Sequence, residues 1–257
     1  MAAAVFSRLR GAVLPVLLLL VLEAYVRGPG RDSDALAAPS AAARAFTQAL
    51  FDGSLLQATA FTLGSAALGL GVALAAGTLL GIWFGLSRRA GSFSFLTVEV
   101  LRPVPSVALI PLAMLVFGFG LRMETAVVAF AVFWPVLVLA QAAARQVEPR
   151  LLEVAAALGL SPRARLVKIV LPAMVARLFV ALRLGVAIAL VVAVTVEIAA
   201  NPHGMGYAIM VAQQSLDPAL MLAWLAWIAV VGYAINAFAL RLERRVARAM
   251  GVAEPRP

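Results

Sequence analysis

Residues 153–172 decide how the rest of the chain is interpreted, and they read Glu153-Val154-Ala155-Ala156-Ala157-Leu158-Gly159-Leu160-Ser161-Pro162-Arg163-Ala164-Arg165-Leu166-Val167-Lys168-Ile169-Val170-Leu171-Pro172. The residues up to Leu158 are good helix formers, and Gly159 can end a helix with a positive φ. Ser161 suits an N-cap and Pro162 suits the first position of a second helix. The stretch therefore predicts a hairpin of two helices joined by a tight turn.

The second helix of this hairpin is amphipathic. Leu166, Ile169 and Val170 fall on one face, while the basic residues fall on others. A single amphipathic helix lying on lipid headgroups is the alternative interpretation. Such a helix would not need the turn that Gly159 and Ser161 specify, so the hairpin is preferred.

The sequence around the hairpin is too apolar for a water-soluble domain. Of the 257 residues, 64% are hydrophobic and 13% are charged, and the mean hydropathy is +1.01. Soluble domains are about half apolar and about a quarter charged. The long unbroken apolar runs exclude a barrel, whose strands alternate polar and apolar positions. The composition therefore predicts an all-α integral membrane protein.

Six apolar runs are long enough to approach the ~20 residues of a spanning helix. They cover about residues 11–26, 56–86, 92–117, 124–144, 178–199 and 219–240. The third run is interrupted by Arg102-Pro103-Val104-Pro105. The first could instead be a signal peptide, since residues 35–37 resemble a cleavage site, but that site lies far beyond the apolar run, behind charged residues. An uncleaved first helix is therefore preferred.

The segments between the runs are predicted as follows. Residues 27–55 form an external loop with a short helix near 41–51, and residues 201–218 form a second external loop. Residues 88–89 mark a turn on the other side. Within the second span, small residues recur at every fourth position and predict a stripe for close helix packing: Ser65, Gly69, Ala73, Gly77, Gly81 and Gly85.

The distribution of basic residues predicts the orientation of the chain. Six spans place both termini on one side, together with fifteen of the Lys and Arg residues, against four on the other side. Because cytoplasmic segments carry the excess of basic residues, both termini and residues 145–177 are predicted to be cytoplasmic. The net charge of +9 thus reflects membrane orientation, and no nucleic-acid partner is expected.

The hairpin resembles the signature of the inner-membrane permeases of binding-protein-dependent importers, which use an ATP-binding cassette. That signature is Glu-Ala-Ala, three residues, Gly, nine residues, Ile, one residue and Leu-Pro. The chain matches it at six positions, and Val154 in place of the first Ala is the one departure. The matching residues are Glu153, Ala155, Gly159, Ile169, Leu171 and Pro172.

This resemblance implies a type I importer permease fold and a role for the hairpin. In the family the hairpin docks into an ATPase subunit, so Glu153, Ala155, Ala156, Gly159, Ser161 and Pro162 are expected to form the coupling surface. The other expected partners are a periplasmic or lipid-tethered solute-binding protein, a second copy of the chain and the lipid bilayer of the cell inner membrane. In the family, closure of the ATPase dimer on ATP draws two hairpins together and opens the path outward.

The resemblance covers about residues 55–248, and weaker matches favour its nitrate, sulfonate and taurine branch. These matches include Arg102 to Pro105, Glu197 and the segment Gly204-Met205-Gly206-Tyr207. The implied substrate is a small anion, with another solute such as a vitamin precursor as the alternative. The expected organisation is residues 1–55 as a first helix and external loop, 56–248 as the permease domain, and 249–257 as a cytoplasmic tail.

The chain is not expected to be an enzyme or to hold a cofactor. Lys168 is the single lysine and lies between Val167 and Ile169, which excludes a Gly-Lys-Ser/Thr phosphate loop, so ATP hydrolysis must come from a partner. With no Cys and one His, neither a thiolate nor a histidine-based metal site is expected. A membrane enzyme would need clustered acids or histidines.

Charged residues within spans are functional candidates because they are unfavourable in lipid. Arg102, beside Pro103 and Pro105, is a candidate for lining the path of an anionic substrate, with the alternative that it lies near the cytoplasmic face and reaches the headgroups. Glu197, at the outer end of the fifth span, is predicted to line or gate the path or to form a structural ion pair. A secondary transporter or channel is the rival function, but the two halves show no convincing repeat.

Overall fold

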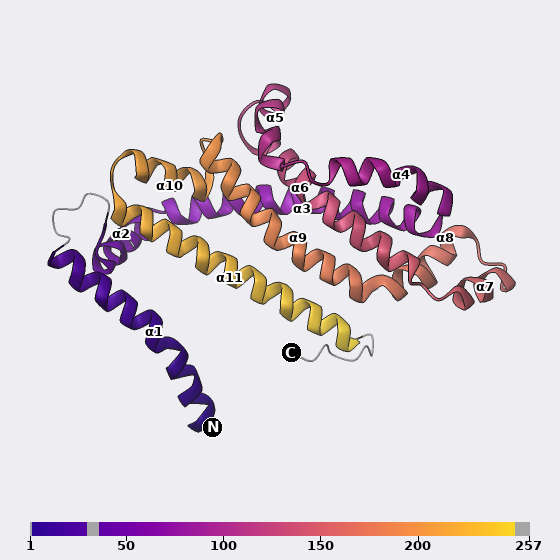
Figure 1. Cartoon of the computed structure of the whole chain (residues 1–257), viewed down its shortest axis with the longest axis horizontal. Coiled ribbons are helices and arrows are strands. Elements are labelled where there is room, and N and C mark those ends of the chain that lie inside the picture. Colours follow the sequence, from indigo (N-terminus) through magenta and orange to yellow (C-terminus); the bar gives the residue numbers. More distant parts are fainter. Residues whose placement is uncertain (1, 30–35, 250–257) are drawn as a thin grey trace.

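Helices form all the regular elements in the part of the chain that the computed structural model describes, residues 2–29 and 36–249 (Figure 1). The predicted tail after residue 249 and Ala35 of the alternative cleavage site lie outside that part. In chain order the elements are α1 Ala2–Arg27, α2 Pro39–Phe51, α3 Ser54–Leu86, α4 Arg88–Leu101, the 3₁₀ turn η1 Ser106–Leu109, α5 Ile110–Phe117, α6 Leu121–Arg145, α7 Pro149–Ala157, α8 Pro162–Arg165, the π-helical turn η2 Leu166–Val170, α9 Leu171–Ala199, α10 Gly204–Gln214 and α11 Pro218–Ala249.

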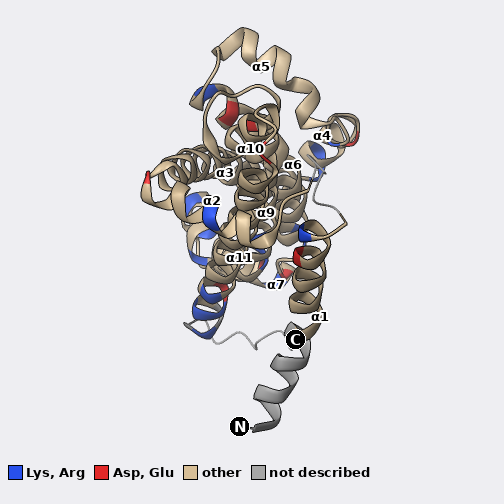
Figure 2. Cartoon of the chain, turned by 90° about the vertical axis from the view of Figure 1, so that its left-hand side faces the viewer, with Lys and Arg blue, Asp and Glu red and all other residues tan. Residues whose placement is uncertain are grey.

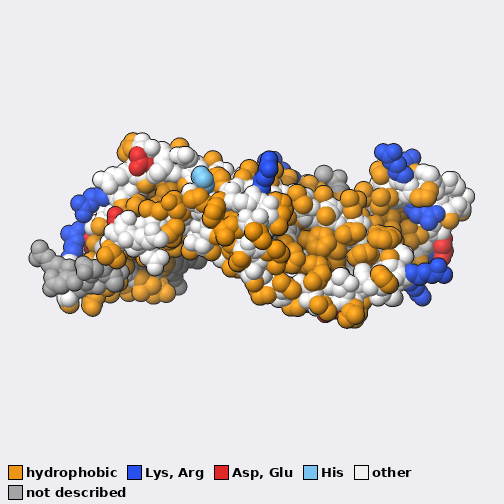
Figure 3. Space-filling model, turned by 90° about the horizontal axis from the view of Figure 1, so that it is seen from above, with side chains coloured by type: hydrophobic (Ala, Val, Ile, Leu, Met, Phe, Trp, Pro, Cys, Tyr) orange, Lys and Arg blue, Asp and Glu red, His pale blue; other side chains and the backbone are white. Residues whose placement is uncertain are grey.

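Four helical stretches are long and apolar enough to cross a membrane, built on α3, α6, α9 and α11. A fifth span results if the bent pair α4 and α5 is taken as one. α1 covers the first predicted span, which is not among these stretches, and the large apolar side chains of residues 13–21 are exposed on it. Seen from above, hydrophobic side chains cover much of the middle of the molecule, and Lys and Arg lie mostly toward its two ends (Figure 3). The all-helical membrane fold is confirmed.

α3 and α6 pack in parallel along the predicted stripe of small residues. A Cβ on Gly81 would lie 2.6 Å from the Cβ of Ala140, and one on Gly85 would lie 2.5 Å from that of Ala144. Contacts this close require glycine, because any side chain would push the helices apart. Both pairs are 59 positions apart in the sequence, so one register holds along the interface. The packing role predicted for the stripe is confirmed.

The third predicted span is broken more sharply than the sequence indicates. α4 ends at Leu101, and α5 leaves it at an angle of 84°. Pro103 and Pro105 lack backbone N–H groups and cannot continue the helix. At its other end α4 begins at Arg88, after the N-cap Ser87, whose hydroxyl accepts a hydrogen bond from the Ala90 N–H at 3.3 Å. The turn predicted at residues 88–89 therefore lies at Ser87.

The second helix of the predicted hairpin is not separate from the fifth span. From Pro162 the chain is helical through α8 and η2 into α9, so α9 begins at Leu171 and not near residue 178. Hydropathy indicates where a helix enters the membrane, but it does not indicate where the helix begins. The π-helical turn precedes Pro172, and the Leu171 N–H bonds to the Leu166 carbonyl, five residues back. Pro172 has no N–H and cannot donate a helical hydrogen bond, and the wider π-helical turn lies where that bond is missing.

The two predicted external loops both contain a helix. The helix expected near residues 41–51 is α2, and α1 is joined to it where Glu23 accepts hydrogen bonds from the Ser40 N–H at 2.9 Å and the Ser40 hydroxyl at 2.7 Å. The second loop contains α10, whose Met205 and Ile209 are buried against α2, α3 and α11. Both helices lie at the end of the molecule opposite α7 (Figure 1).

Candidate functional site

The hairpin turn is formed by a helix C-cap at Gly159. Gly159 has a φ of +64°, and its N–H bonds to the Ala156 carbonyl at 3.0 Å, while the Leu160 N–H bonds to the Ala155 carbonyl at 3.0 Å. These two bonds make a Schellman motif, which favours glycine at the left-handed position. The local sequence thus predicts the turn correctly, and it ends α7.

The chain then turns directly into the next helix. The Ser161 hydroxyl accepts from the Ala164 N–H at 3.2 Å, and Pro162 occupies the first helical turn. Further along, Leu171 packs against a core that contains Val170 and Met174, and Ile169 is half-buried. Pro172 is exposed beside the π-helical turn. The Ile-x-Leu-Pro end of the signature therefore lies at the junction between the hairpin and α9, where it packs on the core.

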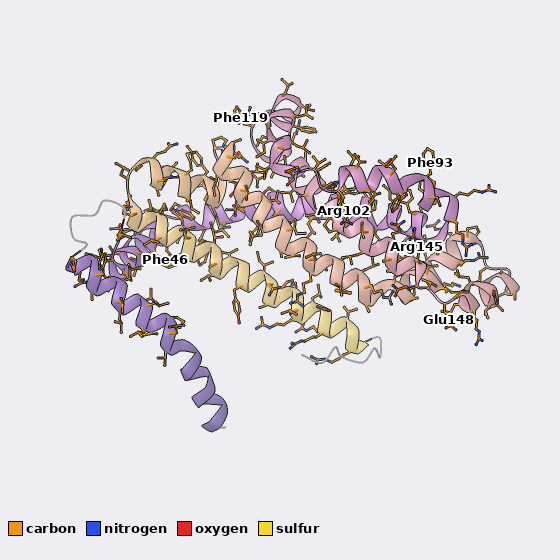
Figure 4. The ribbon with its side chains drawn as sticks, in the orientation of Figure 1. Phe46, Phe93, Arg102, Phe119, Arg145 and Glu148 are labelled. Carbon is orange, nitrogen blue, oxygen red and sulfur yellow. The ribbon has the colours of Figure 1, made fainter. Side chains whose placement is uncertain are left out.

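α7 presents an apolar stripe to the outside of the chain. Leu151, Val154 and Leu158 recur at helical spacing on this nine-residue helix and its C-cap and are exposed, Leu158 to 70%. Glu153 and Ala156 are also exposed. Figure 4 places Glu148, just before α7, at the same end as Arg145, beyond the apolar middle of the molecule. An exposed apolar stripe at that position favours contact with another protein.

Ala155 does not contribute to this stripe. Its side chain is fully buried, and the neighbouring Leu152 packs on the core formed by the ends of α6 and α9. The small side chain at 155 therefore allows α7 to lie close to its own chain. Among the predicted coupling residues, Glu153, Ala156, Gly159, Ser161 and Pro162 remain exposed.

Arg102 lies at the helix break and not near the end that carries the hairpin. Fourteen residues of α4 separate it from the turn at Ser87, about 21 Å at 1.5 Å per residue. Figure 4 places Arg102 near the middle of the long axis. Its side chain is 52% exposed, and its guanidinium lies 3.8 Å from the Glu99 carboxylate. Charged side chains within membrane-spanning segments usually face water or protein rather than lipid.

Pro103 and Pro105 border Arg102 on the side of α5. The chain after them continues as η1 and α5 to Gly118, and no amide hydrogen is available at either proline. Non-helical backbone at membrane depth is tolerated where it lines a cavity or is covered by protein. The exposed Phe93 on α4 and Phe119 after α5 lie on the same upper side of the view (Figure 4).

Glu197 occupies a different environment from the one predicted for it. It is fully buried, and its carboxylate accepts a hydrogen bond from the Gly206 N–H at 2.8 Å. Gly204 lies so close that a Cβ there would overlap this carboxylate. Among the described residues no basic group pairs with Glu197, so the predicted ion pair is absent. In this conformation the side chain has no exposure to a path.

Glu124 is the functional candidate that the sequence did not reveal. It lies at the start of α6, is fully buried, and contacts Ser65 and Asn201 through hydrogen bonds. A carboxyl so near a predicted span boundary is easily taken for a surface residue. The signal that could have identified it is the stripe on α3, because its register places Ser65 opposite Glu124. Acidic residues are otherwise few and scattered over the molecule (Figure 2).

The buried acids do not form a metal centre of the usual kind. Within residues 2–29 and 36–249, no group of three or more His, Cys, Asp or Glu side chains is arranged to hold a metal ion. What Glu124 and Glu197 form is a buried polar cluster between three spans and α10. It lies far along the long axis from the hairpin.

The sequence matches one family model, described as the binding-protein-dependent transport system inner membrane component, over residues 77–250. The riboflavin transport system permease protein of Chloroflexus aurantiacus is 32% identical over 91% of this chain and 89% of its own length. The taurine transport system permease protein of Escherichia coli K12 is 29% identical over 77% of this chain and 72% of its own.

The fold matches solved membrane subunits. A chain of the MetNI methionine ABC transporter, in an inward-facing conformation, aligns with a TM-score of 0.64 at 17% identity and covers 72% of this chain and 92% of its own. At that identity the likeness concerns the fold alone.

Proposed function

This chain belongs to the family of binding-protein-dependent transport system inner membrane components, and we propose that two copies of it form the membrane path of an ATP-binding-cassette importer. The observation that carries this proposal is the exposed apolar stripe on α7, at a hairpin that matches the coupling signature of the family. The stripe provides a docking surface for an ATPase subunit. The chain itself performs no chemistry on the solute.

The proposed role of the hairpin also predicts which end of the chain faces the cytoplasm. An ATPase works in the cytoplasm, so the end with α7 and the basic C-terminal part of α11 is the cytoplasmic end. Both chain termini then lie in the cytoplasm, which agrees with the excess of Lys and Arg on that side. The end with α2 and α10 faces a periplasmic or lipid-tethered binding protein, and the protein resides in the cell inner membrane.

The substrate that the path suits best is a small anion of the sulfonate, taurine or nitrate type. Arg102 supports this, because it is an exposed cation beside a broken helix at membrane depth. The similarity to a taurine permease points the same way. The similarity to a riboflavin permease supports a vitamin-like solute as the second candidate. In both cases a separate binding protein would select the solute.

Docking of the ATPase can be tested at Leu158. In Leu158→Glu, the most exposed apolar side chain of the stripe is replaced by a charge, and we expect the ATPase subunit to be lost during co-purification from membranes while insertion is unchanged. Leu216→Asn is the matched control, because Leu216 is also exposed and has a φ of +52°, which asparagine tolerates. Equal recovery of the ATPase with both variants would contradict docking at α7.

A further inference from the structure

Two carboxyl groups lie within hydrogen-bond distance of each other inside the membrane domain, from helices that are remote in sequence. Glu124 comes from α6 and Glu197 from α9, and neither side chain has any exposed surface. Thr62 and Ser65 of α3 and Asn201, just before α10, complete the cluster and are equally buried. The cluster thus joins α3, α6, α9 and α10, away from the hairpin.

Among the residues that the structure describes, no cation forms an ion pair with either carboxyl group. α3, α5 and η1 contain no charged residue at all. On α6 the nearest charge is Arg122, which is exposed, and on α9 it is Arg183, fourteen residues from Glu197. At α10 the nearest titratable groups are His203, exposed and stacked on Phe61 with ring centroids 5.1 Å apart, and the half-buried Tyr207. The ion pairs found in the described ranges lie elsewhere.

Two buried negative charges without a cation would be strongly unfavourable. A single uncompensated buried charge already costs several kcal/mol of folding free energy. A second like charge beside it adds repulsion that the low local dielectric does not screen. One of the two carboxyl groups must therefore be neutral, or a positive species must be bound.

The buried cluster around Glu124 and Glu197 also has more hydrogen-bond acceptors than donors. Ser65 has one hydroxyl hydrogen, but its oxygen lies within hydrogen-bond distance of both the Thr62 carbonyl oxygen, at 2.9 Å, and a carboxyl oxygen of Glu124. In addition, Oε1 of Glu197 and Oδ1 of Asn201 are buried acceptors with no donor. A hydrogen on the carboxyl pair could donate to Ser65 or to the second carboxyl group, and it would reduce this deficit.

We propose that Glu124 and Glu197 form a proton-binding site, in which one proton is shared by the pair and holds α10 against α3, α6 and α9. The remaining negative charge is placed at the start of α10, where the Gly206 N–H donates to Glu197 at 2.8 Å. Helix N-termini favour an anion at that position. Loss of the proton leaves two adjacent carboxylates and loosens the corner between α9 and α10.

The site predicts a signature in the infrared spectrum of the purified full-length chain. At neutral pH the wild-type chain should show the carbonyl stretch of a protonated carboxylic acid, and the band should disappear when the pH is raised. It should be missing in Glu124→Gln and in Glu197→Gln, because a single remaining carboxyl group can ionise beside its hydrogen-bond donors. Glu99→Gln is the control and should keep the band, since Glu99 is half exposed.

Thermal unfolding in detergent gives a second readout. In the unfolded chain both carboxyl groups are exposed and lose their protons above a pH of about 4.3. Above that pH, the folded chain still holds the shared proton. Its stability is therefore full below that pH and falls as the pH rises, by up to about tenfold in the folded-to-unfolded ratio per pH unit for one proton. The pH dependence should shrink in Glu124→Gln and persist in His203→Gln, the control for the nearby imidazole.

Three outcomes would overturn the proposal. The first is a wild-type spectrum with no protonated-acid band at any pH above 5 (roughly one unit above a free carboxyl group). The second is a band that sodium or potassium chloride removes at constant pH, since a bound metal cation would then neutralise the pair. The third is a band that persists in both glutamine variants. The wild-type spectrum needs no variant to fold, and none of these measurements depends on transport or on an ATPase.

Discussion

The Ser65 hydroxyl of α3 contacts the Glu124 carboxyl of α6 in the same register that sets Gly81 against Ala140. Along most of this interface the register brings small residues together, so that the two spans touch along their backbones. Near the start of α6 the same register brings the Ser65 hydroxyl to the Glu124 carboxyl. The stripe that packs the helices therefore also positions one half of the buried acid pair.

Enlarging the stripe should destabilise the membrane domain. In Gly81→Leu the new side chain would meet Ala140 and the Leu137 carbonyl oxygen, 2.6 and 2.7 Å from the position of a Cβ. We expect a loss of about 1–3 kcal/mol or more in unfolding free energy, because the packed backbone of α6 cannot move aside. Gly71→Leu is the matched control, since nothing lies within 4 Å of a Cβ there. Thermal unfolding in detergent should separate the two variants; similar midpoints would contradict backbone contact.

A bulky residue at the hairpin turn should prevent docking of the ATPase subunit. None of the described residues lies within 4 Å of a Cβ on Gly159, so a larger side chain would project outward from the turn. We expect Gly159→Trp to insert normally but to lose ATPase docking and solute uptake. Gly159→Asn should be milder, because asparagine tolerates the left-handed conformation. Normal uptake by the tryptophan variant would refute coupling through this turn.

Removal of the cation at the helix break should weaken transport of an anion. In Arg102→Ala the exposed guanidinium is lost, and a charge-assisted contact of about 1.5–3 kcal/mol disappears with it, which corresponds to roughly a tenfold or greater loss in uptake efficiency. Glu99→Gln should have little effect, because the Glu99–Arg102 pair is exposed and separated by 3.8 Å. Initial rates in proteoliposomes provide the measurement, and an unchanged rate for Arg102→Ala would remove this residue from the path.

Both termini should be protected from the outside of the cell. Epitope tags at the two ends should be cleaved by protease only after the membrane is opened, because the distribution of basic residues predicts that both ends lie in the cytoplasm. A tag inserted after Gly53, in the turn between α2 and α3, serves as the external control. Cleavage of either terminal tag in intact spheroplasts would be inconsistent with six spans.

Features that depend on short stretches of sequence could be predicted well. The turn at Gly159 and the cap at Ser161 are local hydrogen-bond patterns, and the spans follow from how apolar residues partition between water and lipid. The signature of the hairpin likewise identified the family that the chain belongs to. The fifth span was predicted from about residue 178, whereas α9 begins at Leu171. Hydropathy does not distinguish a helix inside the membrane from its continuation outside.

The residues that required the tertiary structure are those whose role depends on another helix. Ala155 was expected on the coupling surface but packs inward. Glu197 was expected to line or gate the path or to form an ion pair, but it lies buried beside Glu124, 73 positions earlier in the chain. Nothing local fixes such pairings, because they depend on the rotation and register of each helix against its neighbours. The sequence alone thus determined an all-helical membrane permease of this family and the local turn of its hairpin. Only the packing of α3, α6 and α9 decided which of its few charged residues are exposed and which are buried together.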